Sequence, residues 1–401
     1  MAKGDHLYDC YNPPKVSFER GEGAYLYTAQ GDRYLDFIAG IAVSSFGHSH
    51  PELIETVKTQ SEKLWHLSNL FRIDGQHELA GKYCAALPWA DKVFFTNSGA
   101  EAVECAMKTA RRYQFGEGRP QRIDILTFSG AFHGRTTAGI NATGNPKYLE
   151  GFGPALPGYI NLPFGDHDAL EAAISDTTAA IMVEPVQGEG GLRALPLECL
   201  RGLRKLCDDN DLVLIYDEVQ SGAGRTGKLF AHEWVGEDGQ PDIIAAAKGI
   251  GGGFPLGACI ASGEVAKHMV PGTHGATYGG NPMAMAVGNK AFDIMTDESF
   301  LEHVIDMSNV MKQQFEGLKD EFPDVVADVR GKGLLCGMKL TKKNVDVRLA
   351  LFDKGLLVGT AGDNVLRMAP PLIITAEHIR EAAGKIREVF IEARNWDDVE
   401  A

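Results

Sequence analysis

Between about residues 77 and 262, the chain alternates short apolar segments with segments of helical periodicity. The apolar segment Leu212–Tyr216 is continuously hydrophobic, as a strand buried on both faces must be. Ile123–Phe128 and Ala179–Val183 are further strand-like segments, and a helical pattern at about 197–208 follows the second of them. This alternation predicts an α/β fold in which helices cover a mostly parallel sheet. Ligands of such sheets bind beyond the carboxyl ends of the strands.

The flanking segments have a different pattern, which predicts a second, smaller α+β domain. Residues 1–50 are punctuated by glycines and resemble a small antiparallel meander. The C-terminal part combines helical periodicity at about 297–318, 345–353 and 376–394 with short strand-like segments between them. We therefore expect a large domain over 51–295 and a small domain over 296–401, which the N-terminal segment 1–50 joins.

Composition excludes several classes of partner. The 39 basic and 54 acidic residues give a net charge of −15, which argues against nucleic acid. No apolar run is long enough to cross a membrane. The seven cysteines contain no CxxC pair, and the N-terminus is polar, so we expect a reducing, cytoplasmic location. His48 and His50 lack further residues at ligand spacing, so we predict no metal site.

A single lysine, Lys248, lies in the apolar and glycine-rich segment Pro241–Ala258. The short apolar run before it predicts a buried strand, and the glycines after it argue against a regular element. Burial disfavours the ammonium form and leaves a nucleophilic amine, as Schiff-base chemistry requires. Alternatively, Lys248 reaches solvent from the end of the strand.

Two of the predicted strand ends carry groups suited to a phosphorylated, nitrogen-containing ring. Ser98, Gly99 and Ala100 lie where a strand gives way to a helix, and backbone N–H groups there can bind phosphate. A helix N-cap is the alternative. Asp217 follows a buried strand and needs a cation, such as a protonated pyridine nitrogen, unless it only caps a turn.

Three further side chains complete this predicted constellation. Gln220 can hydrogen-bond a ring hydroxyl, and Phe132 can stack on a planar ring or belong to the core. Arg135 has the geometry for a substrate carboxylate, or for a surface salt bridge. Together with Lys248, the set favours pyridoxal phosphate over other common cofactors. The chain lacks a GxGxxG unit between strand and helix, a P-loop and an HExxH motif, which weakens nicotinamide, nucleotide and zinc-hydrolase alternatives.

The chain resembles the class III aminotransferases, which are fold type I pyridoxal-phosphate enzymes. The resemblance covers nearly the whole length, through NSGAEAVECAMKTAR, FHGRT, EPVQGEGG, DEVQSGAGRTG, AAAKGIGGGFPLGA and HGATYGGNP. Within the class, HLSNLF, FHGRT and EPVQGEGG are most similar to the acetylornithine and succinylornithine aminotransferases. Two departures are Ser-Gly-Ala for the more usual Ser-Gly-Thr, and GATY for GSTF or GSTY.

The resemblance implies a role for each matching residue of the cofactor site. Lys248 would hold the cofactor and move the proton, while Asp217 would bind the ring nitrogen. Gly99 and Ala100 would form the phosphate-binding turn. Gln220 would bind the ring hydroxyl, and Phe132 and Val219 would cover the two ring faces. Thr277 would reach the phosphate of the cofactor in the partner subunit. The last contact implies a homodimer with shared active sites.

The resemblance also implies how two unlike substrates share one site. Arg135 would bind the distal carboxylate, while Glu189 and Arg367 would form a pair that opens only for glutamate. Ile41 stands where some ornithine-specific relatives place a tyrosine, which disfavours free ornithine. The implied reaction, in arginine metabolism, transfers the terminal amine of N-acetylornithine or N-succinylornithine to 2-oxoglutarate. The alternatives are another ω-amino acid aminotransferase (ornithine, 4-aminobutyrate), an aminomutase or decarboxylase on the same fold, and a non-enzymatic binding protein.

Overall fold

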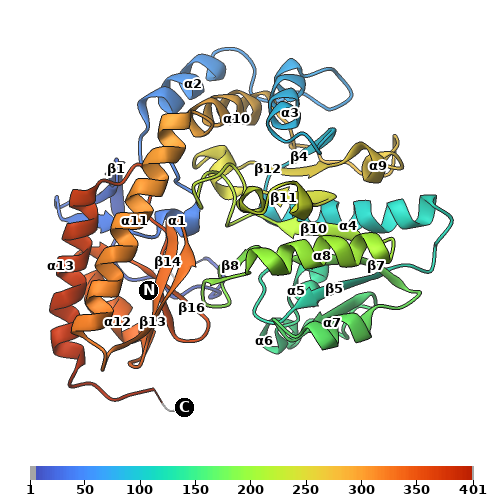
Figure 1. Cartoon of the computed structure of the whole chain (residues 1–401). Coiled ribbons are helices and arrows are strands. Elements are labelled where there is room, and N and C mark those ends of the chain that lie inside the picture. The colour runs from blue at the N-terminus through green and yellow to red at the C-terminus, as the bar shows by residue number, and fades with distance from the viewer. Residues whose placement is uncertain (1–5, 400–401) are drawn as a thin grey trace.

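The computed structural model describes residues 6–399, and a seven-stranded sheet lies at its centre (Figure 1). The strand order is β4-β12-β11-β10-β7-β5-β6. All strands run parallel except β12, which is antiparallel to both of its neighbours. The mostly parallel sheet is therefore confirmed, although the sequence did not indicate β6 or the reversed β12. The bounds are β4 Lys92–Thr96, β5 Asp124–Phe128, β6 Tyr159–Leu162, β7 Thr178–Val183, β10 Val213–Asp217, β11 Ile243–Ala246 and β12 Gly257–Ala261.

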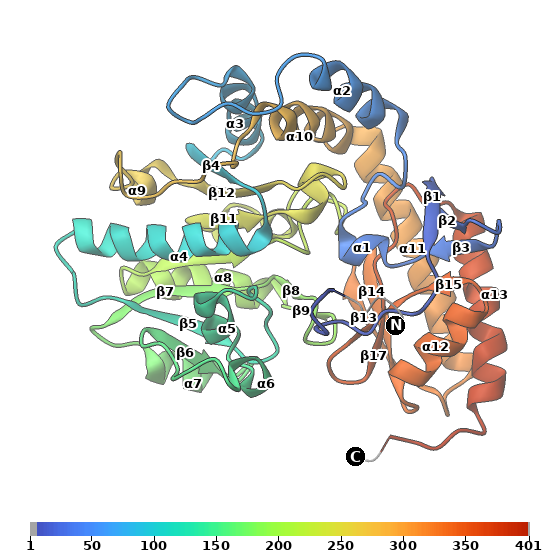
Figure 2. The same cartoon turned by 180° about the vertical axis from the view of Figure 1, so that it is seen from behind.

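Helices cover both faces of this sheet, and its central strands are accordingly apolar and buried throughout. Every residue of β7, β10, β11 and β12 is buried. Helix α4 lies on one face and α8 on the other, as the opposite views of Figures 1 and 2 show. The bounds of the helices in this part are α4 Gly99–Gly116, α5 Thr137–Thr143, α6 Pro146–Leu149, α7 His167–Ala173, α8 Leu197–Asp209 and α9 Gly263–Ala266.

Three further helices pack together at one end of the molecule, shown at the top of Figure 1. They are α2 (Pro51–Ser61), α3 (Asp74–Ala86) and α10 (Pro282–Met295). Helix α2 ends at Ser61. Pro51 is its first residue, where the missing proline N–H costs nothing.

The C-terminal part forms its own core around a four-stranded antiparallel sheet, ordered β13-β14-β17-β16. Its helices have their apolar faces in that core, as their periodicity predicts. The bounds are α11 Glu298–Glu321, β13 Val326–Lys332, β14 Leu335–Leu340, α12 Asn344–Asp353, β15 Leu356–Leu357, β16 Gly359–Ala361, β17 Val365–Met368 and α13 Ala376–Ala393.

The N-terminal strands pack on this C-terminal part. Strands β1 (Phe18–Glu22), β2 (Tyr25–Thr28) and β3 (Arg33–Asp36) form a meander, and β15 extends its sheet by pairing parallel with β3. Leu35 and Phe37 belong to the C-terminal core. The division into segments 1–50, 51–295 and 296–401 stays a prediction.

A buried arginine connects the two parts close to the cavity described below. Arg225 is 1% exposed, and its guanidinium donates to the carbonyls of Leu334 (3.2 Å) and Pro370. The Arg225 carbonyl in turn accepts from the Leu334 N–H at 3.0 Å. These bonds fix the loop that follows β10 against the β13–β14 turn and the segment after β17.

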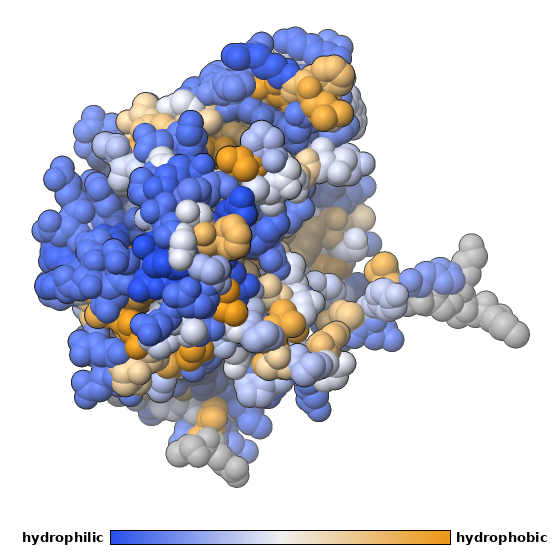
Figure 3. Space-filling model, turned by 90° about the vertical axis from the view of Figure 1, so that its right-hand side faces the viewer, coloured by the Kyte–Doolittle hydropathy of each residue, from blue (hydrophilic) through white to orange (hydrophobic). Residues whose placement is uncertain are grey.

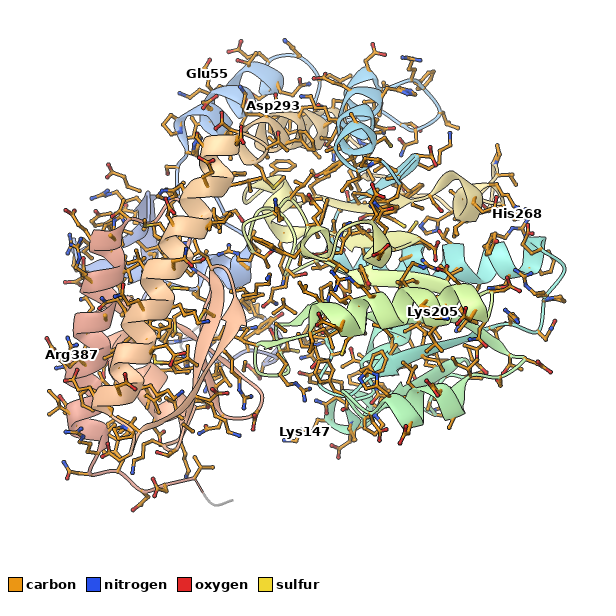
Figure 4. The ribbon with its side chains drawn as sticks, in the orientation of Figure 1. Glu55, Lys147, Lys205, His268, Asp293 and Arg387 are labelled. Atoms are coloured by element: carbon orange, nitrogen blue, oxygen red, sulfur yellow. The ribbon has the colours of Figure 1, made fainter. Side chains whose placement is uncertain are left out.

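The surface is mainly hydrophilic on the face shown in Figure 3, with apolar side chains in small groups. Charged residues such as Glu55 and Arg387 lie at the periphery (Figure 4). Within residues 6–399, no helix combines the length and apolar character that crossing a membrane requires.

Candidate active site

A cavity of about 410 Å³ opens at the carboxyl-terminal edge of the central sheet. Its walls come from the segments that follow β4, β5, β7, β10 and β11, which the sequence places at one edge. Nine predicted site residues line it together: Ser98, Gly99, Ala100, Phe132, Arg135, Asp217, Val219, Gln220 and Lys248.

Lys248 lies directly beyond β11 and begins a single 3₁₀ turn, Lys248–Gly251, so the glycines permit one short regular element. Its φ of +52° is unusual for a residue with a side chain and stores backbone strain. Burial, and next the positive charge of Arg367, lower the pKa of Lys248 to about 8. A much larger fraction of this amine is therefore neutral and nucleophilic near neutral pH than of an ordinary lysine.

Asp217 is the last residue of the central strand β10 and is 3% exposed. One carboxylate oxygen lies 2.8 Å from His133 Nδ1, and the other accepts from the Val219 N–H at 3.1 Å. Burial opposes a charge on His133, but the hydrogen bond and charge of Asp217 outweigh it, so the pKa of His133 is raised. Both oxygens of the buried Asp217 carboxyl group thus have a hydrogen-bond partner.

Glu184 lies beside Asp217, because Val183 and Tyr216 are partners in the parallel pair β7–β10. Its carboxyl group is buried and accepts from the N–H groups of Phe132 (3.1 Å) and Gly188 (3.4 Å). Burial, together with the charge of Asp217, raises its pKa to about 8, although His133 opposes this.

The sequence did not single out His133 or Glu184. Each nevertheless lies in a segment expected at the carboxyl end of a strand, residues 129–135 and 184–191. Their positions beyond strand ends were the feature of the sequence that could have identified these two residues.

The turn before α4 has the features of an anion site. Ser98 caps the helix by accepting from the Glu101 N–H at 3.2 Å, so the capping alternative is correct for its hydroxyl group. Gly99 and Ala100 line the cavity at the start of this 18-residue helix. A Cβ on Gly99 would lie 2.7 Å from Val219 Cγ1, so only glycine lets these two segments approach so closely.

Buried Arg367 and partly exposed Glu189 form an ion pair beside the cavity. Arg367, on β17, is 4% exposed. Its Nη1 donates a hydrogen bond to the Glu189 carboxylate and another, at 3.4 Å, to Gln220 Oε1. Its Nε is buried and has no hydrogen-bond partner within residues 6–399. The charge of Arg367 reaches Lys248, whose pKa it lowers. Gln220, which lines the cavity, thus connects it to the Arg367–Glu189 pair.

Besides Glu189 and Arg367, two more predicted residues do not line the cavity. Thr277 is exposed in the segment that precedes α10. Ile41 is 43% exposed with φ +64°, and Val43 lines the cavity instead. Their roles stay predictions, and that of Thr277 requires a second subunit.

The residues of the cavity fit pyridoxal phosphate. The turn at Gly99 offers helix N-terminal N–H groups to a phosphate, and Asp217 offers a buried negative charge to a pyridinium. Phe132 and Val219 supply apolar walls, and Lys248 supplies the amine with the lowered pKa. No group of three or more potential metal-ligating side chains occurs among residues 6–399.

Comparison with known proteins agrees with this chemistry. The family model of class-III aminotransferases matches residues 9–390. A protein of Brucella melitensis named acetylornithine aminotransferase is 58% identical over 94% of this chain and 93% of its own. Acetylornithine aminotransferase 2 of Caulobacter vibrioides is 56% identical over 97% and 96%.

Solved structures give the same result. The N-acetylornithine aminotransferase of Stenotrophomonas maltophilia superposes with a TM-score of 0.83 at 36% identity, covering 95% of this chain and 96% of its own. The ornithine aminotransferase of Toxoplasma gondii reaches 0.91 at 31% identity, covering 97% and 93%. The chain therefore belongs to the class-III aminotransferases, the family of pyridoxal-phosphate-dependent enzymes that its cavity fits.

Proposed function

We propose that the protein transfers the terminal amino group of an N-acylornithine, acetylated or succinylated, to 2-oxoglutarate. The products are the N-acylglutamate semialdehyde and glutamate. The observation that carries this proposal is the pair of Glu189 with the buried Arg367 beside Lys248, because it suits two substrates that differ in charge at the reacting carbon. The names of the similar proteins support the choice of acetylornithine.

When bound, pyridoxal phosphate supplies the aldehyde that takes up the amino group and the ring that accepts electrons. In this proposal Lys248 binds the cofactor covalently and moves the proton between substrate carbon and cofactor. Asp217, with His133 behind it, keeps a proton on the ring nitrogen. Gln220 orients the ring hydroxyl, and Phe132 covers one ring face.

The carboxylates of the substrates need separate cations. Arg135 binds the distal carboxylate of either substrate, since it lines the cavity and is exposed. Glutamate also has a carboxylate on the reacting carbon, and Arg367 binds it once Glu189 swings aside. An acylornithine has only hydrogens there, and Glu189 then neutralises the buried Arg367, which would otherwise be a costly unpaired charge.

An amine-donor panel with 2-oxoglutarate as acceptor tests the substrate. We expect acetylornithine or succinylornithine to exceed free ornithine in kcat/KM by on the order of 10²-fold or more, because free ornithine must bury an α-ammonium group without a partner. Ile41 offers that group no hydrogen bond. Free ornithine or 4-aminobutyrate as the best donor would contradict the assignment.

A homodimer is part of the proposal. Large apolar side chains are exposed near the Thr277 segment, among them Trp65, Leu70, Phe71 and Tyr278. Asn69 ties their loop to this segment by donating to the Ala276 carbonyl at 3.0 Å. Light scattering should give twice the 43.4 kDa chain mass, and a monomeric active enzyme would contradict shared sites. The seven free cysteines support a reducing, cytoplasmic location.

A further inference from the structure

Arg135 lies on the cavity wall with its charge unneutralised by the protein. It is exposed, and within the part of the chain that the structure describes its guanidinium makes no hydrogen bond or ion pair. Such a group is available to a substrate carboxylate. A long exposed side chain, however, samples many rotamers, and fixing one of them on binding costs affinity.

An aromatic ring restricts this freedom. The central carbon of the Arg135 guanidinium lies 3.7 Å from the ring centroid of Tyr148. At that distance the ring covers one face of the planar guanidinium, because an edge contact would place the two centres farther apart. The N–H groups around the guanidinium edge then stay free for the two oxygens of a carboxylate.

The same ring connects Arg135 to the predicted cofactor wall. Phe132 lies 5.5 Å from the guanidinium, and the rings of Phe132 and Tyr148 meet edge to face with centroids 6.3 Å apart. Arg135, Tyr148 and Phe132 are therefore mutual neighbours. Their contacts place the Arg135 guanidinium relative to the Phe132 ring, which would stack on the cofactor.

The local fold holds Tyr148 in place. Tyr148 lies in the short helix α6, whose first turn is capped by Asn145 accepting from the Lys147 N–H at 3.0 Å. The carbonyl of Thr143, just before this turn, accepts from Asn161 Nδ2 at 3.3 Å. Lys147 points away from the body of the molecule (Figure 4), while Tyr148 is half-buried.

We propose that Tyr148 is a positioning and specificity-determining residue, which stacks on Arg135 and presents its free edge to the distal carboxylate of both substrates. The inference rests on the proposed role of Arg135. It predicts that Tyr148 acts on substrates through their distal carboxylate and leaves the cofactor and the proton-transfer steps unchanged.

The test compares Tyr148→Leu, which removes the stack, with Tyr148→Phe, which keeps it. In Tyr148→Leu we expect KM for the acylornithine and for glutamate to rise by roughly 3- to 10-fold, the size of a cation–π contact, with kcat unchanged. Tyr148→Phe should stay close to the parent. An alkylamine donor without a distal carboxylate should keep its KM in both variants.

The chain offers a matched control in Tyr27, whose ring lies 3.7 Å from the Arg20 guanidinium and outside the cavity. Tyr27→Leu should leave both KM values unchanged. In an Arg135→Gln background, Tyr148→Leu should have no further effect, because the group it positions is gone.

Each outcome decides the proposal. An unchanged KM in Tyr148→Leu, an equal loss in Tyr148→Phe, or lost cofactor absorbance in Tyr148→Leu would overturn the role of Tyr148. If Arg135→Gln alone leaves KM unchanged, Arg135 does not bind the carboxylate and the proposal fails with it. Failure of the acylornithine assignment can be told apart from failure of the Tyr148 proposal. The KM for glutamate tests Tyr148 whether or not an acylornithine is the other substrate.

Discussion

His133 Nδ1 lies 2.8 Å from a carboxylate oxygen of Asp217, and neither side chain is more than 3% exposed. A buried carboxylate is costly unless a cation or hydrogen bonds compensate it. His133 supplies such a hydrogen bond. The hydrogen bond holds the Asp217 carboxyl group at the carboxyl end of β10, where it can bind a pyridine nitrogen.

Asp217→Asn keeps the shape of the side chain and removes its charge. We expect proton abstraction from the substrate to slow by on the order of 10²-fold or more, because the cofactor ring then loses its proton and its electron demand. Single-turnover absorbance measurements with glutamate report this step. Asp242→Asn is a matched control, since Asp242 is also largely buried and cation-paired, at 2.9 Å from Arg204. Turnover within a few-fold of the parent would make Asp217 structural.

The lowered pKa of Lys248 should be visible in the apo-protein. The neutral amine attacks the aldehyde of pyridoxal phosphate, so the rate of covalent reconstitution should rise with pH through about 8, the pKa of Lys248. Stopped-flow absorbance across pH 6–10 measures the midpoint. A midpoint near the ordinary lysine value of 10.5 would contradict burial of this amine.

Two variants control this measurement. Arg367→Gln removes a positive charge that lowers the pKa of Lys248, so the midpoint should move upward. Lys248→Ala should bind cofactor without a borohydride-reducible link to the protein. A reducible link with multiple turnovers in Lys248→Ala would show that another residue holds the cofactor.

Glu189→Ala should affect the two half-reactions unequally. With an acylornithine, Arg367 loses its partner and becomes a buried unpaired charge beside the substrate. With glutamate, the substrate carboxylate replaces Glu189, so less should be lost. We expect kcat/KM of the acylornithine half-reaction to fall by on the order of 10-fold more than that of glutamate. Equal losses in separate single-turnover measurements would refute the switch.

Glu184→Gln tests whether the buried carboxyl group keeps its proton. The raised pKa means that the folded protein retains a proton between about pH 4.5 and 8 that the unfolded chain releases. The parent should therefore lose stability over this range, whereas the amide does not titrate. Thermal unfolding should show the Tm of Glu184→Gln rising relative to the parent from pH 5 to pH 8. A constant difference between the two proteins would mean that Glu184 is ionised throughout.

Much of the site was accessible from the sequence because its parts are local. The continuous apolar run at residues 212–216 indicated a buried strand, and Asp217 at its end was an evident candidate. Ser98 before the start of α4 fitted both a cap and a phosphate turn, and its hydroxyl group does cap the helix. The antiparallel β12 was missed, since its five small and apolar residues give no sign of strand direction.

The sequence by itself determined the short-range features: the apolar strands, the helix caps and a lysine held among glycines. These depend on residues that are close neighbours in the chain. Only the tertiary structure decided which distant groups meet. His133 pairs with Asp217 across 84 positions, which nothing in the sequence indicated, whereas the pair of Arg367 with Glu189 across 178 positions was expected from the family resemblance alone. The physical reason is that such contacts follow from strand order and from packing between the two parts of the molecule, which no local periodicity specifies.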